Sequence, residues 1–222
     1  VLVKLSVDKA LLKARSHMKR GELAEAEILY KSVLKAFPTN KKAKQGLAGL
    51  KNPPKTTINL KLPQEAIEEL VRFYNTGRLE LVIEKAQKLT KIYPEEFVVW
   101  NLLGAASAGL GKVVEASQAF KRVIEINPKF ADGYNNFGLA CQQLGRREEA
   151  IKAYTIALKL NPNYAIAYNN LGNTLKEIGS LEEAINAYKK ALSLEPNYAA
   201  AYNNFGNALK DQGKLDEAIT AF

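Results

Sequence analysis

The sequence predicts an all-α solenoid of stacked antiparallel helix pairs. Glycine and proline each recur in steps of 34 residues, at Gly77, Gly111, Gly145, Gly179 and Gly213 and at Pro94, Pro128, Pro162 and Pro196. Between these breaks the apolar residues follow helical periodicity. Self-similarity with a period of roughly 20 to 50 residues is typical of repeat architectures. We therefore expect the 222 residues to form a series of repeats rather than globular domains.

One unit, residues 165–198, shows how each repeat is predicted to fold. Gly179 separates two helical segments, because glycine can adopt the left-handed conformation that closes a helix. Ser180 and Glu183 then predict a capping box at the start of the second helix, and Pro196 ends that helix. Each unit is thus a predicted helical hairpin. The two apolar stripes are Tyr168, Leu171, Leu175 and Ile178, followed by Leu181, Ala184, Ile185, Tyr188, Ala191 and Leu192.

These units resemble the tetratricopeptide repeat, whose signature combines an aromatic residue, a Leu-Gly pair, a small alanine, a second aromatic and a proline. The resemblance implies a right-handed α-solenoid, a tetratricopeptide superhelix, in which the first helices line a concave groove that binds proteins or peptides. The signature residues are Trp100, Leu103, Gly104, Ala116, Phe120 and Pro128, then Tyr134, Phe137, Gly138, Ala150, Tyr154 and Pro162, then Tyr168, Leu171, Gly172, Ala184, Tyr188 and Pro196, and finally Tyr202, Phe205, Gly206, Ala218 and Phe222.

The chain is predicted to have three regions. Residues 1–50 form a divergent N-terminal hairpin plus one further helix, Lys41 to Leu50, which covers it. Residues 51–62 are a linker, because Pro53-Pro54 favours extended polyproline geometry. Residues 63–222 form the array, with units 63–96, 97–130, 131–164, 165–198 and a truncated 199–222. The unit 63–96 is divergent, since Val82 replaces the small alanine and Ala86 the second aromatic.

The net charge of +9 is unevenly distributed. Residues 1–62 carry 14 Lys and Arg against 4 Asp and Glu, whereas residues 63–222 carry 18 against 19. A basic start of this kind can contact an acidic partner or nucleic acid. Stacking aromatics are almost absent among these cations, which does not favour nucleic acid. The predicted groove is close to neutral.

Composition argues against several classes of chemistry. One cysteine and one histidine cannot build a zinc site or an intramolecular disulfide, so no metal and no cofactor is expected. Cys141 falls in a column that leucine fills in the next two units and is predicted to be a small buried hydrophobe. No uncharged stretch reaches the roughly 20 residues that span a bilayer, and the start lacks the pattern of a signal peptide. We therefore expect a cytoplasmic chain that is not an enzyme.

The candidate peptide-binding site is a ladder of asparagines on the first helices. Asparagine has mediocre helix propensity, so its recurrence inside helices needs an explanation. An amide side chain offers donors and an acceptor, which suits the backbone of an extended peptide. The alternative is that these amides only bridge neighbouring hairpins. The ladder comprises Asn101, Asn135, Asn136, Asn169, Asn170, Asn173, Asn203, Asn204 and Asn207.

The ladder resembles that of the repeat arm of O-linked N-acetylglucosamine transferases, and the resemblance implies that Asn136, Asn170 and Asn204 contact the bound polypeptide. The function predicted is a protein- or peptide-binding scaffold without catalysis in this chain. The alternative is the substrate-recruiting N-terminal arm of a larger glycosyltransferase, sulfotransferase or methyltransferase, because the pattern from Leu62 and from Trp100 resembles bacterial arms of this kind. The unfinished hairpin at Phe222 leads us to expect further chain and self-association through its apolar surface.

Overall fold

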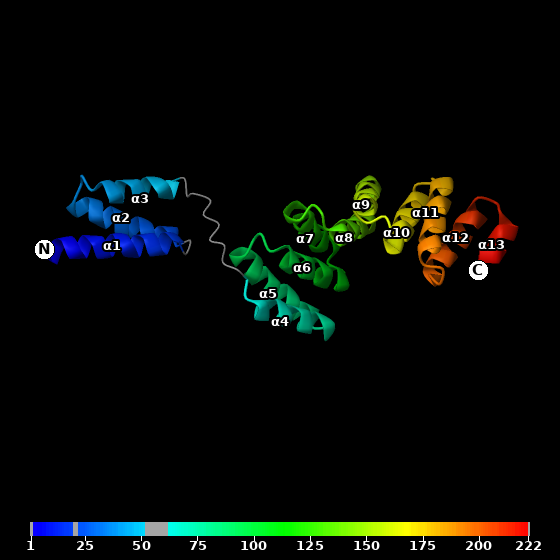
Figure 1. Ribbon diagram of the computed structural model, residues 1–222, viewed down its shortest axis with the longest axis horizontal. Helices are drawn as coiled ribbons and strands as arrows, with labels where there is room; N and C mark the ends of the chain where they lie inside the picture. The colour runs from blue at the N-terminus through cyan, green and yellow to red at the C-terminus, as the bar shows by residue number, and fades with distance from the viewer. Residues whose placement is uncertain (1, 20–21, 52–61, 222) are drawn as a thin grey trace. The chain divides into compact units, whose positions relative to one another are not determined.

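The computed structural model describes residues 2–19, 22–51 and 62–221, and within these ranges it holds thirteen α-helices and no strand (Figure 1). The predicted all-α class is therefore confirmed. The helices belong to two compact units, residues 1–61 and residues 62–222.

The first unit contains α1 (Leu2–Lys19), α2 (Leu23–Ala36) and α3 (Lys41–Lys51). Its buried core joins Leu11 and Ala14 of α1 to Tyr30 of α2 and Ala43 of α3. Gly46 lets α3 approach the hairpin, because a Cβ there would lie 2.3 Å from the ring of Tyr30. Helix α3 therefore packs on the hairpin that α1 and α2 form.

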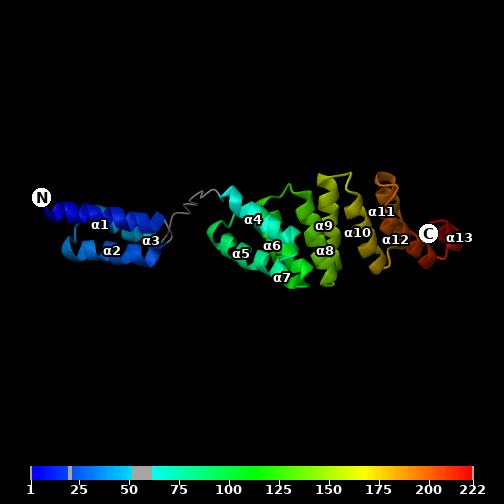
Figure 2. The ribbon, with the colours of Figure 1, turned by 90° about the horizontal axis from the view of Figure 1, so that it is seen from below.

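The second unit is a stack of five helical hairpins, and successive hairpins lie side by side (Figure 2). In the three central hairpins, a glycine of the first helix faces an aromatic ring of the second, so the two helices pack closely; these contacts are Gly104 with Phe120, Gly138 with Tyr154 and Gly172 with Tyr188. The pairs are α4 (Gln64–Asn75) with α5 (Leu79–Ile92), α6 (Phe97–Gly109) with α7 (Val113–Ile126), α8 (Ala131–Gln143) with α9 (Arg147–Leu160), α10 (Ala165–Glu177) with α11 (Leu181–Leu194), and α12 (Ala199–Asp211) with α13 (Leu215–Ala221).

The recurring glycines close the first helices of the second unit, as predicted. All five have a positive φ, between 71° and 83°. At Gly145 the backbone N–H of Arg146 donates to the carbonyl of Cys141 at 2.9 Å, and that of Gly145 donates to Gln142 at 2.9 Å. This pair of bonds is the Schellman arrangement, which satisfies the last carbonyls of the helix.

Two details of the sequence prediction are corrected by the structure. Ser180 is the N-cap of α11, but its side chain makes no capping hydrogen bond, because its backbone (φ −77°, ψ 66°) is not in the extended conformation of an N-cap. Leu62, assigned to the linker, is 6% exposed and belongs to the core of the second unit. Lys51 ends α3. The remaining linker residues, 52–61, lie outside the described ranges.

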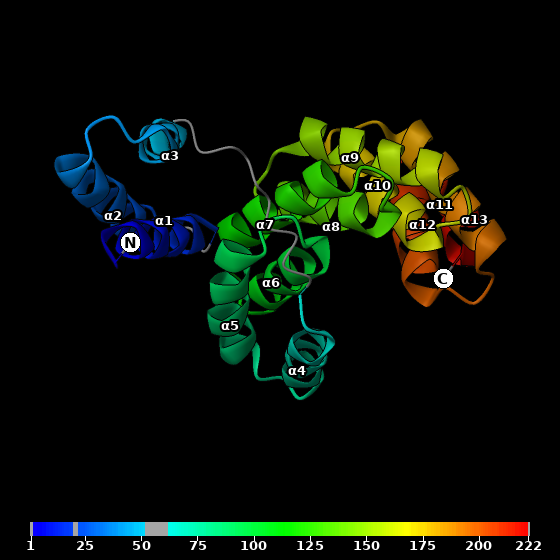
Figure 3. The ribbon, with the colours of Figure 1, turned by 60° about the vertical axis from the view of Figure 1, so that its left-hand side comes forward.

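The second unit bends toward its first helices, and Figure 3 shows the resulting arc from α4 to α13. The first helices of consecutive hairpins contact one another, from α4 with α6 to α10 with α12. No two second helices of consecutive hairpins approach that closely in the described chain. The first helices therefore line the concave side of the bend, which we call the inner face.

Candidate peptide-binding surface

One column of the inner face changes character along the array. It consists of residues 34 apart on successive first helices, namely Val71, Ala105, Leu139, Asn173 and Asn207. Val71 and Leu139 are 38% and 40% exposed, large fractions for apolar side chains. The surface therefore presents aliphatic groups near α4 and α8 and amides near α10 and α12.

Further apolar side chains lie exposed on the same helices. Tyr74 on α4 and Ile166 on α10 are 37% and 45% exposed. A hollow of about 530 Å³ runs along α4 beside Ile67 and Val71, with Glu68 and Arg72 among its other lining residues. The sequence prediction missed Val71, Tyr74 and Leu139. Val71 and Leu139 stand in the column of Asn173 and Asn207, and that position was their signal, whereas Tyr74 shares no column with the predicted asparagines.

The asparagine pairs join neighbouring first helices. Asn170 Nδ2 donates to Asn135 Oδ1 at 3.0 Å, and Asn204 Nδ2 donates to Asn169 Oδ1 at 2.9 Å. Asn135 and Asn169 are each only 5% exposed, whereas Asn170 and Asn204 are half-buried. These amides therefore do bridge neighbouring hairpins, as the alternative interpretation proposed. Asn170 and Asn204 nevertheless stay partly open to solvent.

The ladder is incomplete at both ends. Asn101 Oδ1 is buried and has no hydrogen-bond partner among the described residues. Asn136, which stands 35 residues further along, instead accepts a long bond of 3.4 Å from Asn135 Nδ2. Asn203 is exposed and makes no bond within the described part of the chain. These three asparagines therefore occupy three different environments.

The remaining predicted amides also differ from one another. The hydroxyl of Tyr188 donates to Asn173 Oδ1 at 2.7 Å, so Asn173 helps to hold a buried ring. Asn207 is exposed, and its side chain makes no hydrogen bond with the described residues. In the preceding repeat the Tyr154 hydroxyl donates to Gln142 Oε1 at 3.3 Å. The inner face and the buried tyrosines are therefore linked by hydrogen bonds.

Charged groups on the inner side pair across repeats. Glu177 accepts hydrogen bonds from Gln142 Nε2 at 2.7 Å and from Arg147 Nε at 3.1 Å. Lys176 Nζ lies 3.9 Å from Asp211 Oδ2. These partners lie 30 to 35 residues apart in the sequence. Pairing of this kind leaves little unbalanced charge to attract a ligand of either sign.

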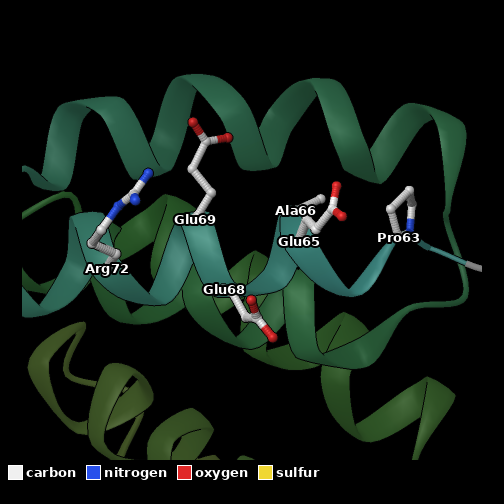
Figure 4. A pocket seen from close by; sticks show the side chains of 6 residues that line it. All are labelled: Pro63, Glu65, Ala66, Glu68, Glu69 and Arg72. Carbon is white, nitrogen blue, oxygen red and sulfur yellow. The ribbon is translucent and has the colours of Figure 1, made fainter.

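Helix α4 carries three glutamates, all in its first half. A hollow of about 600 Å³ is lined there by Glu65, Glu68, Glu69 and Arg72 together with Pro63 and Ala66. Figure 4 shows Glu68 on the opposite side of the helix from Glu69. Lys85 Nζ binds Glu69 Oε1 at 2.9 Å, which neutralises one of these carboxylates.

Buried tyrosines predict a loss of stability at alkaline pH. Burial raises the pKa of Tyr154, Tyr164 and Tyr188 above the ordinary value near 10. Their stabilising effect is complete below about pH 10 and is lost above it, because the unfolded chain releases these protons first. We expect tyrosinate absorbance of these residues to rise together with loss of helical circular dichroism. Ionisation of all tyrosines near pH 10 with unchanged helicity would contradict this linkage.

The described residues offer no group of three His, Cys, Asp or Glu side chains that could hold a metal ion. Among them, no helix combines the length and the apolar character that a bilayer span requires. Cys141 is fully buried beside Ala150 and Tyr154, and burial raises the pKa of its thiol. Its environment is that of the small buried hydrophobe that the sequence predicted.

Comparisons with known proteins agree with this geometry. Models of the tetratricopeptide repeat match residues 98–130, 138–179 and 172–213. No curated protein matches the chain. A crystal structure of MamA is 28% identical with a TM-score of 0.64, and the match covers 68% of this chain and 88% of that one.

Two structures with lower sequence identity to this chain have the same fold. MamA from Desulfovibrio magneticus RS-1 is 19% identical with a TM-score of 0.67, and the match covers 72% of this chain and 90% of that one. YrrB, described as a tetratricopeptide-repeat protein with an unusual peptide-binding site, is 18% identical with a TM-score of 0.63, covering 74% and 84%. The hairpin geometry, the glycine-aromatic packing and these matches together show that the chain contains tetratricopeptide repeats and has the α-solenoid fold that such repeats build.

Proposed function

We propose that this chain is a protein-interaction scaffold that binds an extended polypeptide along its inner face. The observation that carries the proposal is the bend of the array toward its first helices. A bend of this kind produces an extended concave surface, which is the surface that repeat proteins use for binding. The peptide-binding site named for YrrB supports the same class of ligand.

The amides supply a regular set of acceptors for a peptide backbone. Asn170 and Asn204 use their Nδ2 atoms in the bonds between repeats, and their side-chain oxygens have no partner among the described residues. A half-buried carbonyl without a partner can accept a hydrogen bond from a peptide N–H. Asn136 stands in the same column one repeat before Asn170. The proposed contact is therefore a row of amide oxygens along the bound chain.

Exposed aliphatic side chains on the inner face are expected to select the side chains of the ligand. Leu139 on α8 and Ile166 on α10 are exposed, and a ligand could cover both. Covering an exposed apolar side chain contributes about 1 to 2 kcal/mol, depending on the area buried. We propose that bound segments place aliphatic or aromatic residues against Leu139 and Ile166 and polar groups against the asparagines of α10 and α12. Affinity is then expected to depend weakly on salt.

Display selection of short random peptides against the full chain tests this proposal. Peptides enriched on the unmodified protein should lose at least about tenfold in affinity for a variant carrying Leu139→Asp and Ile166→Asp, because both changes place charge where apolar groups dock. The matched control carries Val114→Asp and Ile156→Asp. These residues are exposed to similar degrees on the second helices α7 and α9. The control should bind as the parent does, and equal losses in both variants would reject the inner face as the site.

A further inference from the structure

The side of the second unit that carries the second helices contains a hollow of about 420 Å³ between α5, α6 and α7. Pockets that hold ligands commonly have volumes of roughly 300 to 1,000 Å³. Leu103 and Ser107 of α6 form its floor and are 8% and 1% exposed. Trp100 lines one wall. The inner face described above is not part of this hollow.

The hollow exists because two columns of the repeat carry small residues at this junction. Thr90 on α5 stands where the later repeats have Ile124, Leu158 and Leu192. Ser107 on α6 stands where they have Cys141, Leu175 and Leu209. Both small side chains are buried and line the hollow. A protein interior is normally filled to crystal-like density, so the coincidence of two truncated columns leaves space that a ligand can fill.

The floor of the hollow carries a polar group that lacks a partner. The hydroxyl of Thr90 donates to the carbonyl of Gln87 at 3.1 Å. The hydroxyl of Ser107, in contrast, makes no hydrogen bond with any described residue, and Ser107 is 1% exposed. A hydroxyl that a ligand brings to the floor of the hollow can bond to it.

The rim of the hollow is basic. Lys91 and Lys112 are exposed at its edge, and neither forms an ion pair within the described ranges. Glu115 is the one acidic residue among the lining side chains. The rim therefore attracts negatively charged groups beside whatever enters the hollow.

We propose that this hollow binds the side chain of a tyrosine from a partner polypeptide in which acidic residues flank that tyrosine. The ring packs on Trp100 and Leu103, and the phenol hydroxyl bonds to Ser107. The flanking carboxylates lie near Lys91 and Lys112. This site is separate from the proposed inner-face site and can be occupied independently of it.

Trp100 is the only tryptophan of the chain, so its fluorescence reports on the hollow directly. The full chain is titrated with three capped pentapeptides, Glu-Asp-Tyr-Glu-Asp, Glu-Asp-Phe-Glu-Asp and Lys-Lys-Tyr-Lys-Lys, with excitation where tyrosine does not absorb. The acidic tyrosine peptide should bind about tenfold more tightly than the phenylalanine peptide, because only the phenol satisfies Ser107. The basic peptide should not bind. Equal binding of all three peptides, or none by any, overturns the proposal.

Two variants separate the hollow from general effects on the fold. The double variant Thr90→Leu with Ser107→Leu introduces leucine, which the last repeats carry in these two columns. It should fold, melt at a higher temperature and lose peptide binding. Ser107→Ala should keep the hollow and abolish the preference for tyrosine over phenylalanine. Leu139→Asp on the inner face is the control and should leave the Trp100 titration unchanged. Undiminished binding by the filled variant would overturn the assignment.

Discussion

Replacing Gly172 with alanine is expected to lower the free energy of unfolding by about 2 to 3 kcal/mol, the upper part of the range for an overpacked core. The added Cβ would lie 2.6 Å from Cε1 of Tyr188. That ring cannot move aside easily, because Tyr188 is fully buried and its hydroxyl is bonded to Asn173. Gly138→Ala should behave alike, since its Cβ would lie 2.7 Å from the ring of Tyr154. Urea denaturation followed by circular dichroism measures the change.

Gly109→Ala is the matched control for this prediction. Its Cβ would also make one short contact, 2.7 Å, but the atom it meets is the terminal Cδ1 of Leu79. The end of a flexible side chain can rotate away, so the urea midpoint should change little. Combining Gly172→Ala with Tyr188→Leu should recover part of the loss. An equal loss at Gly109 and Gly172 would show that helix backbone effects, rather than ring contact, control the result.

Asn169→Ala is expected to lower the free energy of unfolding by about 1 to 2 kcal/mol. The side chain is 5% exposed, and its Oδ1 accepts the bond from Asn204 Nδ2. Alanine removes the acceptor and leaves a half-buried amide without its partner. The loss of this contact should exceed the gain in helix propensity, which is about half a kcal/mol. Thermal and urea denaturation of the full chain measure the balance.

Two asparagines in the same sequence column provide the controls. Asn203 is exposed, so Asn203→Ala should be neutral or slightly stabilising through helix propensity. Asn101→Ala should raise stability by about 1 kcal/mol, because it removes a buried oxygen that has no partner. The three substitutions thus have different expected signs although the sequence context is similar. A uniform loss of stability across the column would contradict the hydrogen-bond pattern described above.

Much of the fold could be predicted because its signals are local. The turn at Gly145 closes α8 through two backbone bonds, from Gly145 to Gln142 and from Arg146 to Cys141. These bonds span three and five positions, so sequence order alone places the partners close together. Pro162 and the apolar stripes act over similarly short distances. The capping box at Ser180 failed because it depends on the backbone angles of the tight turn after Gly179, and the residue types do not specify those angles.

The asparagine ladder shows where sequence reasoning reaches its limit. Its residues recur every 34 positions, but the bonds join residues 35 apart, such as Asn135 with Asn170. Aligned columns therefore show which residues are equivalent and not which residues touch. The sequence indicated two uses for these amides, a ligand or a neighbouring hairpin, and it contained no signal to separate them.

By itself, the sequence determined the helical hairpin and its period, because each follows from residue type and short-range geometry. Only the tertiary structure decided which face is concave, that Glu177 bonds to Arg147, and that Thr90 and Ser107 leave a shared hollow. Those features depend on how one hairpin rotates and translates onto the next. That rotation is set by the packing of many side chains at once, so no single column of the repeat encodes it.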